Sequence, residues 1–180
     1  MKTKNLVFCA LFAALTAVLS QIAIPIGPVP ITLSHISIFI AAGVLGAKYA
    51  TVSMLIYVLL GVVGAPVFSN FKAGAGVLVG PTGGFIVGYI ACAFVTGLLI
   101  EQYYAKMSSA LLRYGCLLLA ILAGWAVTYA CGLSWFVYST NTDIAAAMSV
   151  CFYPFIPGDI LKSIVSVAAI IKLKPLYESN

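Results

Sequence analysis

Three charged side chains in an otherwise apolar sequence are the first candidates for chemistry: Asp159, Lys162 and Lys72. Asp159 and Lys162 are separated by one helical turn, so in a helix both side chains lie on one face near its start. Together they offer a hydrogen-bond acceptor and a cation to a ligand. The same spacing also suits a structural arrangement, in which Asp159 caps the helix and Lys162 reaches toward it. The spacing leaves both interpretations open, and the two are compatible.

Nothing in the sequence is typical of an enzyme or of a metal site. The single histidine, His35, has no His, Cys or carboxylate at ligand spacing, and no paired-carboxylate or nucleophile-elbow pattern occurs. The five cysteines form no Cys-x-x-Cys pair and lie mostly in apolar stretches, which is typical of packing residues. No Gly-x-x-x-x-Gly-Lys-Ser/Thr loop is present. We therefore expect no enzymatic activity and no cofactor, and uphill transport would need a partner or an ion gradient.

The composition is that of an integral membrane protein. Hydrophobic residues make up 63% of the chain, charged residues make up 7%, and the mean hydropathy is +1.16, whereas about a quarter of the residues of a globular domain are charged. A crossing of the ~30 Å hydrocarbon core takes about 20 helical residues, so the chain holds about six crossings. The basic residues are scattered at segment ends, without the stripe typical of nucleic-acid binding. We predict a single transmembrane domain over residues 1–180, in contact with lipid and not with nucleic acid.

Pro, Gly and charged residues divide the chain into six predicted helices, at 6–24, 31–46, 49–64, 81–101, 114–134 and 158–173. The predicted fold class is therefore all-α, an integral membrane bundle of about six transmembrane helices. The second, third and sixth helices are short for a full crossing, which indicates that they end at a cavity or re-enter the protein. Lys2 and Lys4 before the first apolar stretch resemble the start of a signal peptide, but no clean Ala-x-Ala cleavage site follows. We interpret this stretch as a retained helix.

The distribution of lysine and arginine predicts the orientation of the bundle. If the N-terminus is inside, seven of these residues lie in inner segments and only Lys72 lies in an outer loop, while Lys162 falls inside the sixth helix. Because positively charged loops stay in the cytoplasm, both termini are predicted to be cytoplasmic. The outer face is then made of the segments 25–30, 65–80 and 135–157.

Glycine and alanine patterns indicate two places where another group comes close to the backbone. The segment 61–84 is too rich in glycine for a lipid-facing helix, and irregular backbone at membrane depth is tolerated where it lines a cavity, so we expect it to border a pocket. Its glycines do not have the spacing of a dinucleotide-binding loop. In the first helix, Ala10, Ala14 and Ala17 form a strip of small residues that lets another helix pack closely.

Three motifs, in order along the chain, resemble one transporter family. They are Gly27-Pro28-Val29-Pro30-Ile31-Thr32-Leu33, Gly80-Pro81-Thr82-Gly83-Gly84-Phe85, and Pro154-Phe155-Ile156-Pro157-Gly158-Asp159 followed by Lys162. With the helix count, they resemble the BioY family, the biotin-specific S components of energy-coupling factor (ECF) transporters, over about residues 6–174. The resemblance implies a multi-pass protein of the bacterial cell membrane that binds biotin from outside. It also implies docking on a transmembrane coupling subunit energised by two ATPase subunits, with Ala10, Ala14 and Ala17 as the docking face.

The resemblance further implies which residues bind the ligand. The candidates are Asp159, Lys162, Lys72, Tyr57, Asn70 and Ser34. Biotin needs an acceptor for its ureido N–H groups, apolar walls for its ring and chain, and a cation for its carboxylate. Asp159 suits the N–H groups and Lys72 or Lys162 suits the carboxylate, and which lysine faces which group stays open. Candidate apolar walls are Phe68, Phe71, Trp125, Tyr153 and Phe155, although bundle packing or an interfacial belt is the more ordinary role of such rings.

The chain departs from the family pattern at two of these places. After Ile-Thr-Leu it has Ser34 and His35 where the family usually has Gln, and it has Asn70-Phe71-Lys72 where the family usually has Gly-Gly-Arg. Lysine cannot make the two-pronged contact that arginine makes with a carboxylate. Either a point charge holds the carboxylate here, or the ligand differs somewhat from biotin.

Two other functions compete with a biotin-specific S component. An ion-coupled or stand-alone transporter of a biotin-like or other vitamin would need a carboxylate deep in the bundle, whereas Asp159 is at a helix end and Glu101 is at the inner boundary. A structural membrane protein without a ligand would leave the glycine-rich outer segment and Lys72 without an evident purpose.

Overall fold

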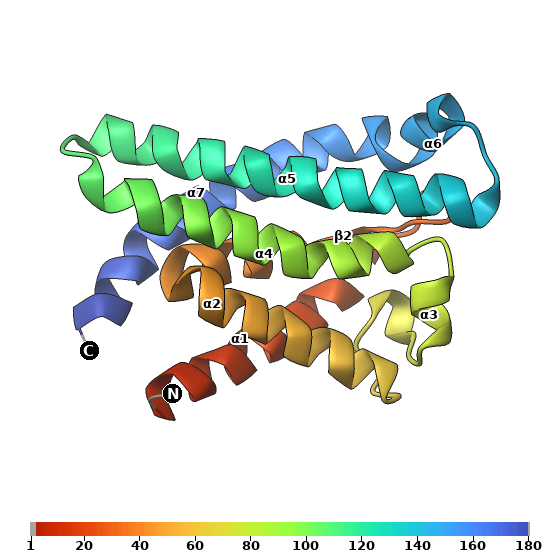
Figure 1. The fold of residues 1–180 in the computed structure, drawn as a ribbon, viewed down its shortest axis with the longest axis horizontal. Coiled ribbons are helices and arrows are strands. Elements are labelled where there is room, and N and C mark those ends of the chain that lie inside the picture. The colour runs from red at the N-terminus through yellow and green to blue at the C-terminus, as the bar shows by residue number, and fades with distance from the viewer. Residues whose placement is uncertain (1–2, 180) are drawn as a thin grey trace.

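Long apolar helices make up most of the computed structural model, which describes residues 3–179 (Figure 1). The long elements are α1 (Thr3–Gln21), α2 (Ser34–Val62), α4 (Gly83–Tyr103), α5 (Ala110–Thr140) and α7 (Ile156–Ser179). Within the described residues, five helical stretches are long and apolar enough to cross a membrane, the last of them running from α6 (Ile144–Cys151) through η3 (Tyr153–Phe155) into α7. The structure thus confirms the all-α membrane bundle.

The element α2 consists of two helices that fold back on each other at Gly46. Gly46 has φ +78°, a left-handed value that suits glycine, and a Cβ atom there would overlap the carboxylate of Glu101. Ser34, before the break, and Tyr57, after it, both contact Tyr89, although a straight helix would separate them by about 35 Å. The two halves are therefore antiparallel, which confirms separate second and third helices with a break between 46 and 49.

The two halves of α2 are short, as the sequence indicates. Residues 34–45 span about 18 Å and residues 47–62 about 24 Å, both less than the ~30 Å hydrocarbon core. With α1, α4, α5 and α7 they make six helical passes through the bundle. The outer end of the short first half, where α2 begins, lies against a buried polar cluster. That cluster is the candidate site.

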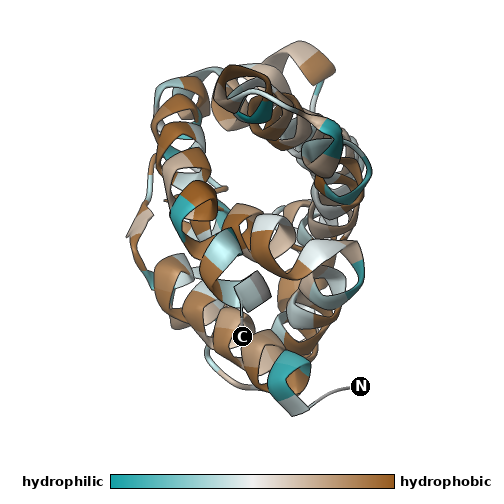
Figure 2. Cartoon of the chain, turned by 90° about the vertical axis from the view of Figure 1, so that its left-hand side faces the viewer, coloured by the Kyte–Doolittle hydropathy of each residue, from teal (hydrophilic) through white to brown (hydrophobic). Residues whose placement is uncertain are grey.

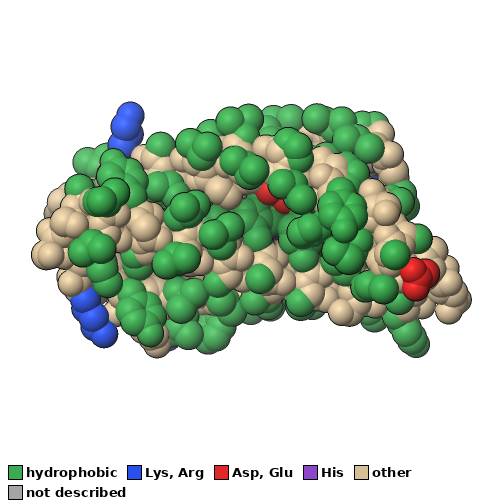
Figure 3. All heavy atoms as spheres, turned by 90° about the horizontal axis from the view of Figure 1, so that it is seen from above, with side chains coloured by type: hydrophobic (Ala, Val, Ile, Leu, Met, Phe, Trp, Pro, Cys, Tyr) green, Lys and Arg blue, Asp and Glu red, His purple; other side chains and the backbone are tan. Residues whose placement is uncertain are grey.

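The start of α1 and the end of α7 lie at the same end of the bundle, together with the connection between α4 and α5, which contains η2 (Tyr104–Lys106) (Figure 1). Figure 3 shows Lys and Arg side chains protruding at this end. This is the end that the distribution of positive charge assigns to the cytoplasm. Lys2, which contributes to that distribution, lies outside the described residues.

Short elements that the sequence does not predict cover the opposite, outer end. The strands β1 (Ala23–Ile24) and β2 (Ile31–Thr32) pair antiparallel and form a ribbon between α1 and α2. The glycine-rich segment contains η1 (Ser69–Phe71) and α3 (Gly76–Val79). Gln21, at the end of α1, holds the start of this segment, because its Nε2 donates to the carbonyls of Val67 and Phe68, each at 3.1 Å. The outer end is therefore a folded cover and not a set of loose loops.

The outer surface of the helices is apolar, and their inner contacts are tight. Large side chains such as Val18 and Leu111 are 62% and 81% exposed, and hydrophobic residues dominate the helices in the view along the bundle (Figure 2). Such exposure marks a surface that faces lipid. Inside, α4 and α5 approach closely at two glycines, which have no Cβ atom. A Cβ on Gly84 would overlap Trp135, and a Cβ on Gly132 would overlap the Phe85 ring.

Candidate ligand-binding site

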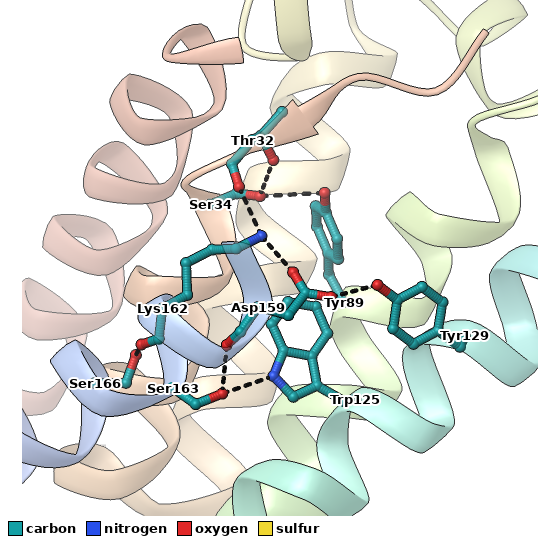
Figure 4. A network of polar contacts seen from close by, with 9 residues as sticks. All are labelled: Thr32, Ser34, Tyr89, Trp125, Tyr129, Asp159, Lys162, Ser163 and Ser166. Carbon is teal, nitrogen blue, oxygen red and sulfur yellow. Dashed lines mark hydrogen bonds and ion pairs between the residues drawn. The ribbon is translucent and has the colours of Figure 1, made fainter. Parts of the chain in front are cut away.

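A buried ion pair on the first turns of α7 is the centre of the candidate site (Figure 4). Lys162 Nζ lies 2.7 Å from Asp159 Oδ1, and the two side chains are only 6% and 10% exposed. The other carboxylate oxygen of Asp159 accepts a hydrogen bond from the Tyr129 hydroxyl of α5. Because α7 begins at Ile156, Asp159 lies inside the helix and not at its cap. Charged groups at this depth are costly, so their burial points to a function.

Hydrogen bonds from α5 and β2 fix the orientation of this pair. Lys162 Nζ donates to the backbone carbonyl of Thr32 at 3.2 Å, which ties α7 to the ribbon. Trp125 Nε1 donates to Ser163 Oγ at 3.0 Å, and Ser163 Oγ donates to the carbonyl of Asp159 at 2.7 Å. Lys162 Nζ also lies 5.0 Å from the centre of the Trp125 ring, a favourable cation–π contact. The pair is thus held between an aromatic wall and the ribbon.

Aromatic rings from three helices surround the pair. The His35 ring, on the first turn of α2, stacks on Trp125 of α5 with centroids 4.1 Å apart and meets the edge of Tyr89 of α4 at 4.9 Å. Tyr89 is itself positioned by Ser34, whose hydroxyl donates to it at 3.1 Å and lies 2.7 Å from Thr32 Oγ1. The wall therefore combines flat apolar faces with a few fixed polar atoms, as small-molecule sites do.

Two small adjoining cavities lie within this cluster. The first, of about 30 Å³, is bordered by Asp159, Lys162, His35, Trp125, Tyr129 and Phe155, among others. The second, also of about 30 Å³, is bordered by Ser20, Tyr57, Ser69 and Thr82, among others. The same residues of the ribbon and of α4 border both cavities: Val29, Pro30, Thr32, Phe85 and Tyr89. Each volume holds about two waters, far less than the ~300 Å³ of an ordinary ligand pocket, so the structure is closed.

A larger hollow elsewhere has a different character. One of about 450 Å³ opens between Leu99 of α4 and Leu112 of α5, on the apolar surface near the cytoplasmic end. In contrast, Figure 3 shows an acidic side chain at the bottom of a hollow on the face formed by α5, α6 and α7. Buried charge distinguishes the outer cavities from the lipid-facing grooves.

The structure brings some of the sequence candidates together and leaves others apart. Asp159 and Lys162 border the first cavity, and Tyr57 borders the second, where its hydroxyl lies 3.0 Å from Ser20 Oγ. Ser34 borders neither cavity and acts through Tyr89. Among the proposed aromatic walls, Trp125 and Phe155 border the first cavity and Phe68 is buried against Tyr57. Phe71 and Tyr153 are 70% and 57% exposed, so they are not walls of this closed state.

Lys72 and Asn70 lie on the exposed side of η1 and border neither cavity. Asn70 and Phe71 have left-handed φ values of 58° and 57°. These are the two positions where the resemblance expects glycine, so this chain makes a left-handed turn with two side chains, at a cost in backbone strain. Ser69, in the same turn, borders the second cavity, which makes it the link between that cavity and Lys72. The binding role of Lys72 and Asn70 stays a prediction.

Sequence reasoning missed two residues of the site, Tyr129 and Tyr89, and considered His35 only as a metal ligand or catalytic residue. A signal for Tyr129 exists, because it follows Trp125 by one helical turn and so shares its face. Tyr89 has no comparable signal in the sequence. Its role depends on how α4 is rotated toward α2.

The strip of small residues on α1 is open to the outside of the bundle. Ala10 and Ala14 are exposed and Ala17 is partly exposed, whereas Ala13 and Thr16, on the other face, are buried. No described element of the chain therefore covers this strip. The strip has the form needed for close contact with another helix.

Comparisons with known proteins agree with this architecture. The family model described as "BioY family" matches residues 1–179. A protein of Thermotoga maritima named "Biotin transporter BioY" is 44% identical over 176 residues, covering 96% of this chain and 97% of the relative. A protein of Rhizobium etli with the same name is 36% identical and covers 92% and 90%. A crystal structure of "the S-component for biotin from an ECF-type ABC transporter" matches with a TM-score of 0.88 at 30% identity, covering 97% and 92%.

Proposed function

Because the chain belongs to the BioY family, we propose that it is the biotin-binding S component of an ECF transporter. It captures biotin at the outer face of the bacterial cell membrane and passes it to partner subunits for ATP-driven uptake. Biotin is the transported ligand and no cofactor takes part. The observation that carries this proposal is the buried Asp159–Lys162 pair beside closed cavities at the outer end of the bundle. Burying a charged pair at this depth is expensive, and a ligand that uses the pair explains why it is there.

The ureido ring of biotin fits the first cavity by its chemistry. Asp159 Oδ1 has no hydrogen bond of good geometry, although Lys162 Nζ lies 2.7 Å away, so it is free to accept from a ureido N–H. Lys162 supplies donors for the ureido carbonyl. Trp125 and Phe155 offer apolar faces for the thioether ring. In this arrangement Lys162 serves the ureido group, and the carboxylate needs another cation.

Lys72 is that cation in the proposal. The second cavity continues from the first past Tyr57 to Ser69, and Lys72 directly follows the turn that contains Ser69. The valeryl chain would lie along the second cavity and bring the carboxylate to the outer rim, where Lys72 is exposed. A lysine at the rim acts as a point charge and holds the carboxylate less rigidly than an arginine fork.

Biotin entry requires the ribbon to move in this proposal. Val29 and Pro30 border both cavities, so their withdrawal would join the two into one larger pocket. The hydrogen bond from Lys162 to the Thr32 carbonyl holds the ribbon closed. Of the outer segments 25–30 and 135–157, the first borders both cavities through Val29 and Pro30, and the second supports it where Gly27 approaches Val150.

The partner subunits follow from membership of an ECF transporter. We propose that the transmembrane coupling subunit packs on the exposed strip Ala10, Ala14 and Ala17, and that two ATPase subunits supply the energy. Small residues let a partner backbone approach closely, which is how helices associate in lipid.

Calorimetry and thermal unfolding of the detergent-purified protein test this function. Biotin should bind with a measurable heat and raise the unfolding temperature, whereas other vitamins should do neither. A response to another vitamin alone would overturn the ligand. Biotin uptake by cells that lack every coupling subunit would favour a stand-alone transporter instead.

A further inference from the structure

We propose that His35 is a specificity-determining residue of this site: its imidazole accepts a hydrogen bond from the ureido N–H that Asp159 cannot serve. The inference rests on the proposed biotin-binding function and adds a residue to it. It is carried by the position of His35 at the cavity and by the two buried side-chain atoms of that cavity, His35 Nε2 and Asp159 Oδ1, that have no hydrogen-bond partner.

The His35 side chain is placed as a ligand-binding group. It borders the first cavity together with Asp159 and Lys162, it is 7% exposed, and its Nε2 atom is buried without a hydrogen-bond partner. Its ring is fixed by stacking on Trp125 at 4.1 Å, by an edge contact with Tyr89 at 4.9 Å and by a tilted contact with Phe39 at 5.9 Å. A buried polar atom without a partner is rare in folded proteins, and a ligand that enters this cavity would remove the anomaly.

His35 is neutral in this arrangement. Lys162 borders the same cavity and is already paired with Asp159, whose carboxylate borders it too. A protonated imidazole would place a second cation beside Lys162 at membrane depth, with no second carboxylate to balance it among the described residues around the cavity. A neutral imidazole has one N–H donor and one acceptor nitrogen, so His35 is able to accept a hydrogen bond.

The directions of the two ureido N–H bonds leave one of them for His35. In a cyclic ureido group the two N–H donors flank the carbonyl and point apart, so the single carboxylate of Asp159, which also accepts from Tyr129, meets one of them. Lys162 is a pure donor and cannot serve the other.

The hydroxyls of Thr128 and Tyr89 border the same cavity and have partners of their own: Thr128 donates to the Gly124 carbonyl at 3.0 Å, and Tyr89 accepts from Ser34 at 3.1 Å. The buried polar side-chain atoms of this cavity that have no hydrogen-bond partner are Asp159 Oδ1 and His35 Nε2. In the tautomer that is protonated at Nδ1, His35 Nε2 accepts from the second N–H. The two N–H groups of the ligand thus donate to side chains from two different helices, Asp159 of α7 and His35 of α2.

The test combines two variants of the protein with three ligands. The ligands are biotin and the two isomeric biotin derivatives that carry one methyl group, each on a different ureido nitrogen. His35→Phe keeps the aromatic stack without the acceptor, and it should weaken biotin binding by about 10- to 100-fold, the usual effect of an unpaired buried donor. His35→Gln keeps an acceptor and should stay within about threefold of the wild type. In the wild type, methylation of either nitrogen should reduce affinity, and in His35→Phe one of the two isomers should bind as well as biotin.

A merely structural role for His35 predicts different readouts. It predicts that His35→Phe unfolds at a lower temperature without ligand, whereas our proposal predicts an unchanged or higher one, because a buried unpaired nitrogen is removed. Equal biotin affinity of His35→Phe and the wild type would overturn the role of His35 and leave the proposed function intact. If His35→Phe does not fold, the wild type decides, since an isomer that binds as tightly as biotin overturns the inference. A wild type that ignores biotin overturns the proposed function itself.

Discussion

Replacing Asp159 by asparagine should weaken biotin binding and destabilise the bundle at the same time. The substitution removes a negative charge 2.7 Å from Lys162 Nζ, and both side chains are almost fully buried. Removal of one partner from a buried ion pair costs about 3–5 kcal/mol. We expect the lower end of this range, because Lys162 keeps its hydrogen bond to the Thr32 carbonyl.

The expected loss of affinity follows from the hydrogen bond that the ligand would lose. A hydrogen bond from a ureido N–H to a charged acceptor contributes about 1.5–3 kcal/mol. Its loss corresponds to a roughly 10- to 150-fold larger dissociation constant. An amide at position 159 still offers one acceptor oxygen but can also turn a donor toward the ligand. We therefore expect a loss of about 10- to 150-fold in calorimetry on the detergent-purified protein.

Asp143→Asn is the matched control for this experiment. Asp143 is exposed at the start of α6, where it accepts a hydrogen bond from the amide of Ala145 at 3.0 Å, and asparagine caps a helix about as well. This variant should change neither stability nor affinity. Combining Asp159→Asn with Lys162→Met should restore much of the stability, because no unpaired charge stays buried, without restoring binding. Wild-type affinity in Asp159→Asn would refute the assignment of Asp159 to the ligand.

Three further predictions follow from other parts of the structure. Lys72→Met should weaken biotin binding about fivefold but leave the affinity for biotin methyl ester unchanged, because only the free acid has a carboxylate to pair with a rim cation; equal losses for both ligands would contradict this role. Gly46→Ala should lower the free energy of unfolding by about 1–3 kcal/mol or more, since alanine is strained at φ +78°. Gly115 lies in open space on α5, so Gly115→Ala should be neutral or slightly stabilising in thermal unfolding. Ala14→Leu should abolish co-purification with the coupling subunit while biotin binding persists, and Ala126→Leu, on the exposed face of α5, should affect neither.

The helical passes of this fold were predictable because their signals are local. Stretches of apolar residues between Pro, Gly and charged residues mark crossings, and α1, α4, α5 and α7 all overlap their predicted ranges. The predicted helix 114–134 is too short at both ends, since α5 runs from Ala110 to Thr140. Arg113 suggested a boundary there, but at the membrane interface a long side chain can lie along a continuing helix.

The outer cover was not predictable in the same way. The strands β1 and β2 are two residues each, too short for an alternating pattern to mark them. The helix α6 falls within a segment that the sequence assigns only to the outer face. Both elements depend on contacts with the rest of the bundle, such as the approach of Gly27 in the ribbon to Val150 in α6.

Half of the candidate site was within reach of sequence reasoning. Asp159 and Lys162 are neighbours because a helix places residues one turn apart on one face, and the structure shows them paired. Tyr129, Tyr89 and His35 reach the same cavity from three other helices. Their meeting depends on the rotation and depth of each helix, which no short stretch of sequence encodes.

The sequence by itself determined that this protein crosses a membrane about six times, with its termini on one side, because hydropathy and positive charge act residue by residue against the bilayer. It also determined the helical neighbours Asp159 and Lys162. Only the tertiary structure decided that the pair is buried beneath a ribbon, that His35 shares its cavity and that Lys72 lies outside it. The physical reason is that burial and the lack of a hydrogen-bond partner are properties of packed helices, and close packing is specified by side chains far apart in the chain.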